Sequence, residues 1–506
     1  MMTARMFWLL PIHVYLHFRN TYPPKSSSRT LNLFATSLLL LSVMLADGRG
    51  ALETANSSSQ VSICPKVSPF GAILQIIKLS TFSTYPSFQN TGLEPMLPIY
   101  QRGILYGDAS IREVSAAGLG ELMVITSNKF LAGPFIIKVT GPLLRIVGDR
   151  NPSAVKIAII KTLGLILSKG GPALRAFVPQ FQTTFFKALS DPARQVRVEA
   201  IKALALLMPL STRVDPLIKE LVSTSLGNGT ASSLDSAAGL VAVQTATLEA
   251  LAIVIKYGGK KAKLPASIPS ALEAGKEMLL HEDDGIRTGA SKVIGVACAL
   301  LNPSTADDVA TELLTGGNSS SEEKHGKACL CLYLLSSSGK FLSSETVESM
   351  AKLIKALMMD ENTQVREAAC VAVGAVLGAV DENDTEKYVS MLQSTILKCM
   401  DPKESMEVLK SIAKGLSVGV TLNSTLFSSK VTFPIVEGAL KCAMSCPGRV
   451  QLAFNDFLWL ALNVKDGEEG LTRYCGEAMF ENSKKMKSLH SKVLVRIKSV
   501  DIDVFA

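Results

Sequence analysis

The stretch DPARQVRVEAIKALALL, residues 191–207, begins as a turn and continues as one amphipathic helix. Asp191 suits the N-cap of that helix, and Pro192 suits its first position, where a missing amide hydrogen costs nothing. Apolar residues then recur at steps of four and three, on one stripe of a helix. They are Val196, Ala200, Ala203 and Leu207. We therefore expect a helix that starts at the Asp-Pro pair and packs through this stripe.

The same pattern recurs along the 506-residue chain. An aliphatic residue followed by a base occurs at Ile111-Arg112, Val155-Lys156, Val196-Arg197, Ile286-Arg287 and Val365-Arg366. The separations of 44, 41, 90 and 79 residues fit one period of about 40 to 45 residues, with two positions skipped. Weaker versions occupy the skipped positions and continue the series, at Val243-Gln244, near His325-Gly326, at Met406-Glu407 and at Val450-Gln451. The period predicts about nine units across residues 91–480.

Each period also contains an earlier helix. Residues 177–189 precede the Asp191 turn, and residues 345–359 precede Asp360. Asp401-Pro402, followed by Glu404, predicts a further capped helix start. Two helices per period, without a long third one, are typical of HEAT repeats and less so of armadillo repeats. We expect an all-α HEAT/armadillo-type α-solenoid, built of antiparallel helix pairs in a right-handed superhelix.

Composition agrees with this fold class. The chain is 47% hydrophobic and only 6% aromatic, which suits short helices packed through Ala, Leu, Val and Ile. The formal net charge of +8 is mild, and no basic block is longer than Lys260-Lys261. This pattern argues against a dedicated nucleic-acid surface. The nine cysteines form no CxxC pair, which favours buried thiols in a reducing compartment, and we expect a cytosolic protein.

The two ends of the chain differ from the array. Residues 1–90 are expected to be a poorly structured leader, and residues 481–506 a helical cap or tail. Within the leader, residues 31–46 form a 16-residue apolar run. This run is shorter than the roughly 20 residues of a membrane-spanning helix. Membrane targeting through it is therefore the minor alternative.

The sequence contains no pattern of catalytic or metal-binding residues. The five histidines, at positions 13, 17, 281, 325 and 490, have no spaced partners. Nucleotide-binding loops, serine-hydrolase elbows and zinc-protease motifs are also missing from the sequence. We expect a binding protein without enzymatic activity, metal or cofactor.

The recurring bases have two expected roles. In HEAT arrays the base of one unit commonly binds the turn aspartate of the adjacent unit, and the repeated contacts form a ladder that fixes the stacking. We expect this structural role for Arg112, Lys156, Arg287 and Arg366. A denser basic set is expected to bind an acidic protein surface. Its members are Arg194, Arg197, Lys202 and Arg213.

Longer ordered motifs suggest a family. These are AAGLGELMVITS (116–127), TGPLLRIVGDR (140–150), PQFQTTFFKALSD (179–191) and STRVDPLIKEL (211–221). With them, residues 92–221 resemble the large HEAT-repeat translational activator of the general amino-acid control pathway, and residues 222–471 resemble it more loosely. Two departures are Asn151-Pro152-Ser153, where the family has an aromatic residue after GDR, and the missing ribosome-associated portion.

The resemblance implies partners. In that family, the matching region binds the RWD domain of the kinase that phosphorylates translation initiation factor two alpha. Other parts of a much longer chain associate with the ribosome. A basic residue between Pro179 and Leu221 is implied in kinase binding, which makes Arg194 and Arg197 the first candidates, followed by Lys202 and Arg213. The alternative is a generic HEAT adaptor for transport or complex assembly.

Overall fold

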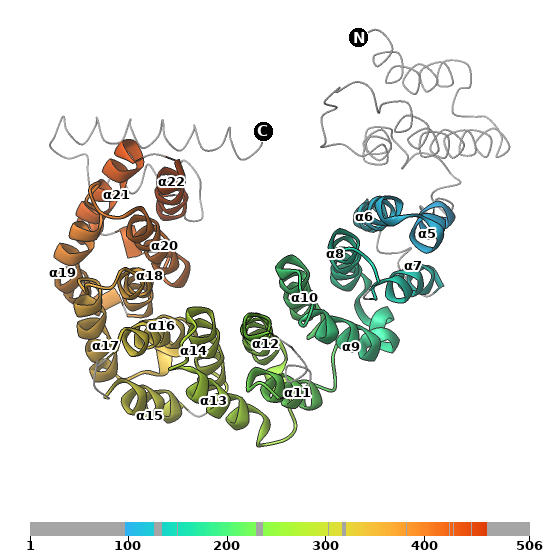
Figure 1. Ribbon diagram of the computed structural model, residues 1–506. Helices are drawn as coiled ribbons and strands as arrows, with labels where there is room; N and C mark the ends of the chain where they lie inside the picture. Colours follow the sequence, from blue (N-terminus) through green and yellow to red (C-terminus); the bar gives the residue numbers. More distant parts are fainter. Residues whose placement is uncertain are drawn as a thin grey trace, which may run out of the picture. The chain divides into compact units, whose positions relative to one another are not determined.

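A computed structural model describes residues 97–462, apart from gaps at 126–133, 149, 229–235, 302, 316–319, 381, 425, 429 and 447. The expected leader (1–90), its apolar run (31–46) and the expected tail (481–506) lie outside the described residues. The chain divides after Ser211 into two compact units. All regular structure in the described part is helical, as Figure 1 shows.

The first unit contains α5 (Leu97–Tyr106), α6 (Ala109–Ile125), α7 (Pro134–Ile146), α8 (Ser153–Gly170), η4 (Gly171–Phe177), α9 (Val178–Ala188) and α10 (Arg194–Leu207). The second unit begins with α11 (Asp215–Ser225), α12 (Ala237–Gly258), η6 (Gly259–Lys261), α13 (Ser267–Met278), α14 (Asp284–Cys298), α15 (Pro303–Leu314), α16 (Ser321–Ser338) and η7 (Gly339–Phe341). It continues with α17 (Ser344–Leu357), α18 (Thr363–Ala379), α19 (Glu382–Cys399), α20 (Met406–Leu422), η8 (Leu426–Ser428), η9 (Lys430–Thr432), α21 (Phe433–Ser445) and α22 (Gly448–Leu462).

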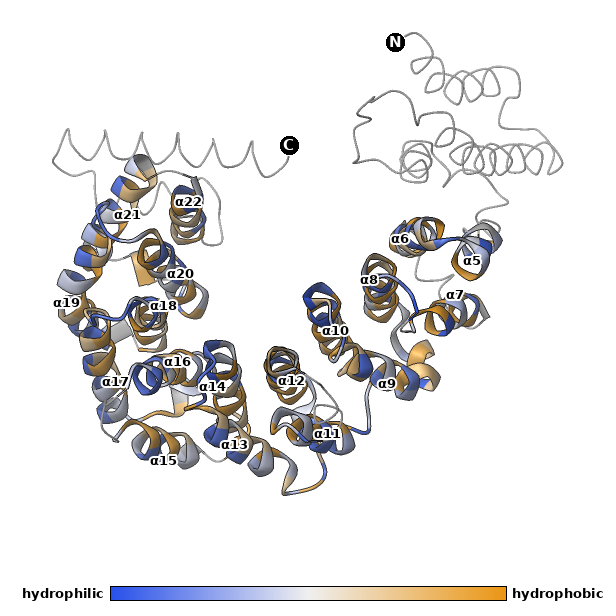
Figure 2. Cartoon of the chain, viewed as in Figure 1, coloured by the Kyte–Doolittle hydropathy of each residue, from blue (hydrophilic) through white to orange (hydrophobic). Residues whose placement is uncertain are grey.

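Within each unit the helices form two layers. Each odd-numbered helix pairs with the even-numbered helix that follows it, and successive even-numbered helices pack side by side (Figure 1). Hydrophobic residues face the neighbouring helices, and hydrophilic residues face outward (Figure 2). The all-α arrangement of stacked helix pairs predicted from the period is confirmed.

The apolar stripes identified in the sequence form the core of the even-numbered layer. Four residues of α10 are buried, namely Val196, Ala200, Ala203 and Leu207. Equivalent residues are buried in α14, namely Ile286, Ala290, Val293 and Ala297, and in α18, namely Val365, Ala369, Ala372 and Val376. Small residues at every second or third core position let neighbouring helices approach closely.

Two even-numbered helices, α18 and α20, touch backbone to backbone. A Cβ atom on Gly374 of α18 would collide with the carbonyl oxygen of Gly415 in α20. A Cβ atom on Gly415 would in turn collide with the carbonyl oxygen of Cys370. Because neither backbone can move without separating the helices, both positions require glycine.

The predicted helix starts at Asp191 and Asp401 are wrong. Helix α10 begins at Arg194, and Asp191 Oδ1 instead accepts a hydrogen bond from Ala193 N at 2.9 Å. Helix α20 has Ser405 as its N-cap, while Asp401 Oδ1 accepts from Lys403 N at 2.9 Å. In both places a proline follows the aspartate and disfavours helical backbone there. The Asp-Pro pair therefore forms a separate turn before the helix.

The helix caps also correct the register of the repeat. In α10, α14 and α18 the aliphatic residue and the base are the third and fourth residues after the N-cap. By the same count the base of α16 is Lys324, next to the predicted His325-Gly326. In α20 the aliphatic residue is Val408, which is buried, whereas the predicted Met406 is 48% exposed. The 40-to-45-residue period was too coarse to fix these two positions.

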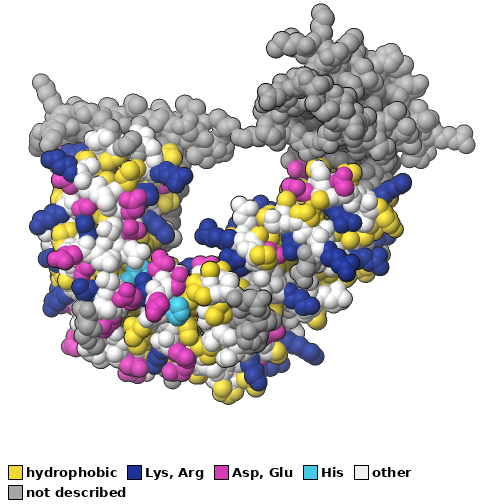
Figure 3. All heavy atoms as spheres, viewed as in Figure 1, with side chains coloured by type: hydrophobic (Ala, Val, Ile, Leu, Met, Phe, Trp, Pro, Cys, Tyr) yellow, Lys and Arg dark blue, Asp and Glu magenta, His cyan; other side chains and the backbone are white. Residues whose placement is uncertain are grey.

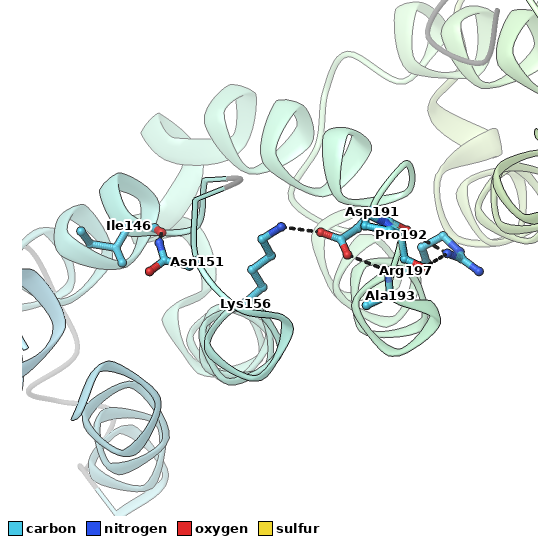
Figure 4. Close-up of polar contacts among 7 residues, drawn as sticks. All are labelled: Ile146, Asn151, Lys156, Asp191, Pro192, Ala193 and Arg197. Carbon is cyan, nitrogen blue, oxygen red and sulfur yellow. Dashed lines mark hydrogen bonds and ion pairs between the residues drawn. The ribbon is translucent and has the colours of Figure 1, made fainter. Parts of the chain in front are cut away.

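Several of the recurring bases reach the turn that precedes the next even-numbered helix. Lys156 Nζ lies 2.7 Å from Asp191 Oδ2, as Figure 4 shows. The same relation joins Arg112 Nη1 to Asn151 Oδ1 at 2.9 Å and Lys324 Nζ to Asp360 Oδ2 at 2.7 Å. Arg366 forms an ion pair with Glu404.

Arg287 has a different set of partners. Its Nη1 donates to the carbonyl oxygens of His281 and Glu282 in its own turn, at 2.7 Å each. Its Nε donates to Nδ1 of His325 on α16 at 3.1 Å. Burial, and next the Arg287 guanidinium, lower the pKa of His325 to about 4, although Asp284 acts in the opposite direction. His325 is therefore a neutral, buried acceptor near pH 7.

We predict that Lys156→Ala lowers the free energy of unfolding by about 2 to 4 kcal/mol, because it leaves the Asp191 carboxylate nearly buried without its cation. Lys161→Ala removes an exposed lysine from the same helix and should change stability by less than about 0.5 kcal/mol. Urea unfolding of both variants measures the difference. Equal losses would show that the Lys156–Asp191 pair contributes nothing specific.

Gly374→Ala should destabilise the second unit by about 3 kcal/mol or more, because the added methyl group pushes α18 and α20 apart. Gly164→Ala in α8 is the matched control, since its Cβ would meet nothing closer than 3.5 Å. The control should be neutral or stabilising by up to about 1 kcal/mol, owing to the better helix propensity of alanine. Thermal unfolding of both variants tests this contrast, and a stable Gly374→Ala protein would contradict the close approach.

His325 should make stability fall in mild acid. The unfolded chain has an ordinary histidine pKa of about 6.5 and the folded chain a value of about 4, so the unfolded state binds more protons between these values. Stability should decrease as the pH falls through this window and lose no more from this group below pH 4. His325→Gln should remove up to about 3 kcal/mol of that decrease. Parallel pH profiles for the two proteins would contradict it.

Candidate functional site

Helix α10 exposes a basic and apolar face. Arg194 is exposed at the first residue of the helix, and Lys202 follows two turns later with 65% of its side chain exposed. Leu206, one turn beyond Lys202, is 42% exposed. Lys202 Nζ lies 3.0 Å from Glu199 Oε1, an exposed i,i+3 pair that is worth little on its own. A partner that supplies a carboxylate can therefore compete for Lys202.

The structure places Arg197 differently from Arg194 and Lys202. Its Nη1 donates to the carbonyl oxygens of Asp191 at 2.8 Å and Pro192 at 3.0 Å (Figure 4). Burial lowers the pKa of Arg197, with Asp191 raising it and Arg194 lowering it further. Arg287 makes the same two carbonyl contacts in its own turn. Arg197 thus stabilises the turn before α10 through these two hydrogen bonds.

Arg213 lies in the second unit, exposed in the segment just before α11. The division of the chain after Ser211 separates it from the other three basic residues. The structure therefore brings Arg194 and Lys202 together on one helix, places Arg197 in the adjoining turn, and assigns Arg213 to another unit.

Sequence reasoning missed a second row of residues on α8. Lys161 and Leu165 are the ninth and thirteenth residues after the cap of α8, as Lys202 and Leu206 are in α10. Both leucines lie against the preceding even-numbered helix, since a Cβ on Gly164 would be 3.5 Å from Leu206 Cδ1 and one on Gly120 would be 3.1 Å from Leu165 Cδ1. The repeated segments KTLGL (161–165) and KALAL (202–206) were a readable signal.

Charge is unevenly divided between the units. Residues 97–211 contain 14 Lys and Arg against six Asp and Glu, whereas residues 212–462 contain 23 against 28. Figure 3 shows the difference on one face, where dark blue side chains outnumber magenta ones on the first unit and the two mix on the second. The net charge of the whole chain hides a basic first unit.

The described residues offer little for catalysis. Burial raises the pKa of Cys298 and Cys329 to about 11 and that of Cys442 to about 12, so these thiols remain protonated. Within the described part, no three His, Cys, Asp or Glu side chains are grouped to hold a metal ion.

Two segments, Ser153–Ala188 and Ala237–Lys261, are long and apolar enough to cross a membrane. Both are helices of the packed layers, with more than half of their most apolar windows buried against neighbouring helices. Core helices of a soluble protein pass the same test of length and composition.

Comparison with solved structures shows the fold. Yeast importin-beta (Kap95p) superposes with a TM-score of 0.51 over 82% of this chain and 53% of that one, at 13% sequence identity. A second importin-beta structure gives a TM-score of 0.50 over 85% of this chain and 56% of that one, at 14% identity. At these identities the likeness concerns the solenoid fold alone.

Comparison of sequences shows the family. The chain is 34% identical to the protein ILITYHIA of Arabidopsis thaliana over 334 residues, which are 64% of this chain and 12% of that protein. It is 30% identical to the human stalled ribosome sensor GCN1 over 319 residues, 62% of this chain and 11% of that one. The eIF-2-alpha kinase activator GCN1 of Saccharomyces cerevisiae is 35% identical over 215 residues, 42% of this chain and 8% of that one.

The chain thus spans only about a tenth of the length of these relatives. The family described as stalled ribosome sensor GCN1-like, HEAT repeats, matches residues 215–499. This match and the sequence identity to the relatives above confirm the family resemblance that the sequence motifs indicated. The chain belongs to the GCN1-like family of HEAT-repeat proteins.

Proposed function

We propose that this chain is a protein-docking scaffold that binds and helps to activate the kinase that phosphorylates translation initiation factor two alpha. Relatives are named as activators of that kinase and as sensors of stalled ribosomes. The kinase's RWD domain is the proposed partner, and a link to the ribosome would come from a longer protein. Because the kinase acts in translation, the proposed location is the cytoplasm.

The observation that carries the proposal is the open basic and apolar face of the first unit. Arg194 and Lys202 of α10 offer cations, while Leu206 of α10 and Leu165 of α8 offer apolar contacts. Charged and apolar groups on one surface fit an acidic partner surface with its own apolar residues. The alternative of a transport adaptor has only the importin-like fold in its favour, and fold alone does not specify function.

The test is a titration of the full chain against the immobilised RWD domain. Arg194→Ala combined with Lys202→Ala should weaken binding about tenfold or more, because two exposed cations at the interface are lost. Arg175→Ala combined with Lys187→Ala is the matched control, since it removes two exposed bases from η4 and α9 of the same repeat, in the other layer. The control should bind like the unmodified chain.

The outcomes separate the site from the function. Equal binding by both double variants would remove the site assignment while leaving the function in place. A chain without substitutions that fails to bind the RWD domain would remove the function itself. Arg197→Ala should be tested separately, because it also removes two hydrogen bonds from the Asp191 turn. Its thermal unfolding should be measured together with its binding.

A further inference from the structure

Four lysines and a tyrosine project from the end of α12. The segment KYGGKKAKL, residues 256–264, runs from the last turn of α12 through η6 into the connection to α13, and we refer to it as the lysine turn. All five of its polar side chains are exposed, namely Lys256, Tyr257, Lys260, Lys261 and Lys263. Tyr257 is 49% exposed, and Lys256 Nζ lies 5.6 Å from the centre of its ring.

The lysine turn is held in a defined conformation by Asp215 of α11. The Asp215 carboxylate accepts hydrogen bonds from the backbone amides of Lys263 at 2.9 Å and Leu264 at 3.1 Å, and from Ser267 Oγ at 2.6 Å. The Ser267 bond is the main cause of the lowered pKa of Asp215, so the carboxylate stays ionised. At the other end of the turn, Gly259 is buried against the half-buried Leu300.

The positive charge of the turn is local, and the Asp215 carboxylate offsets only part of it. No Asp or Glu occurs between Glu249 and Glu273, although the second unit as a whole has more acids than bases. Among the described residues, no carboxylate forms an ion pair with Lys256, Lys260 or Lys263. By contrast, Lys276 and Lys292 in the helices that follow are each paired with glutamate.

We propose that the lysine turn binds single-stranded nucleic acid. Lysine ammonium groups act as point charges for phosphates, and an exposed tyrosine ring is a surface on which one base can stack. Protein interfaces instead favour arginine and are depleted in lysine, and the turn has no arginine. The mild net charge of the whole chain argued against a nucleic-acid surface. That net charge does not reveal this segment, because acidic residues elsewhere in the unit offset its lysines.

The test uses the full chain and a fluorescein-labelled 15-nucleotide oligouridylate, with binding followed by anisotropy over a range of salt concentrations. Lys256→Gln, Lys260→Gln and Lys263→Gln together should weaken binding at least tenfold. They should also make the slope of log K against log salt shallower by about two, since each phosphate contact to a single strand contributes about 0.7. Tyr257→Ala should weaken binding about fivefold or more without changing that slope.

The control replaces three exposed lysines of the same unit, by Lys352→Gln, Lys414→Gln and Lys441→Gln, and should bind like the unmodified chain. Equal losses in the two triple variants would overturn the proposal, as would ultraviolet crosslinks to the RNA confined to residues 97–211. Phosphatidylserine vesicles form a further arm. Lysine-dependent binding to vesicles but not to the oligonucleotide would also overturn it, in favour of a lipid surface.

Discussion

The close approach of successive even-numbered helices is the constraint on which each unit depends. Their contact surfaces consist of alanine, glycine and branched residues, and at Gly374 and Gly415 the two backbones meet. The odd-numbered layer is joined more loosely, through polar contacts such as Lys276 with Glu312 and Lys387 with Glu348. Since each inner even-numbered helix packs on its odd-numbered partner and on the even-numbered helices on either side, no helix pair can bury its core alone.

Polar contacts join several even-numbered helices to the turn before the next one. Where a unit has a lysine at the ladder position, as at Lys156 and Lys324, the next turn has an aspartate. In α12, Gln244 Nε2 donates to the carbonyl oxygen of Ser225 at 3.0 Å, and the turn before α14 has His281, whose Nδ1 accepts the Asp283 amide at 3.0 Å.

The sequence predicted the features that repeat and missed those that do not. The stripe beginning at Val196 revealed the helix pairs, because core packing imposes the same spacing in every unit. The predicted starts of α10 and α20 were wrong because a proline follows the aspartate in each turn. The predicted registers of α16 and α20 were off by two residues, a shift that a period of 40 to 45 residues does not resolve. Arg194, Arg197, Lys202 and Arg213 were predicted as one basic set, which the structure divides between two units. The capture of Arg197 by its own turn depends on carbonyl positions that no spacing reveals.

Helix packing leaves side chains of α8 and α10 exposed, and we propose that this face binds the RWD domain. Hydrogen exchange of the full chain, with and without the RWD domain, tests this claim most directly. Helices α8 (153–170) and α10 (194–207) should gain protection in the complex, while α9 (178–188), in the other layer of the same unit, should not change. Protection confined to α9 and the other odd-numbered helices would contradict the account.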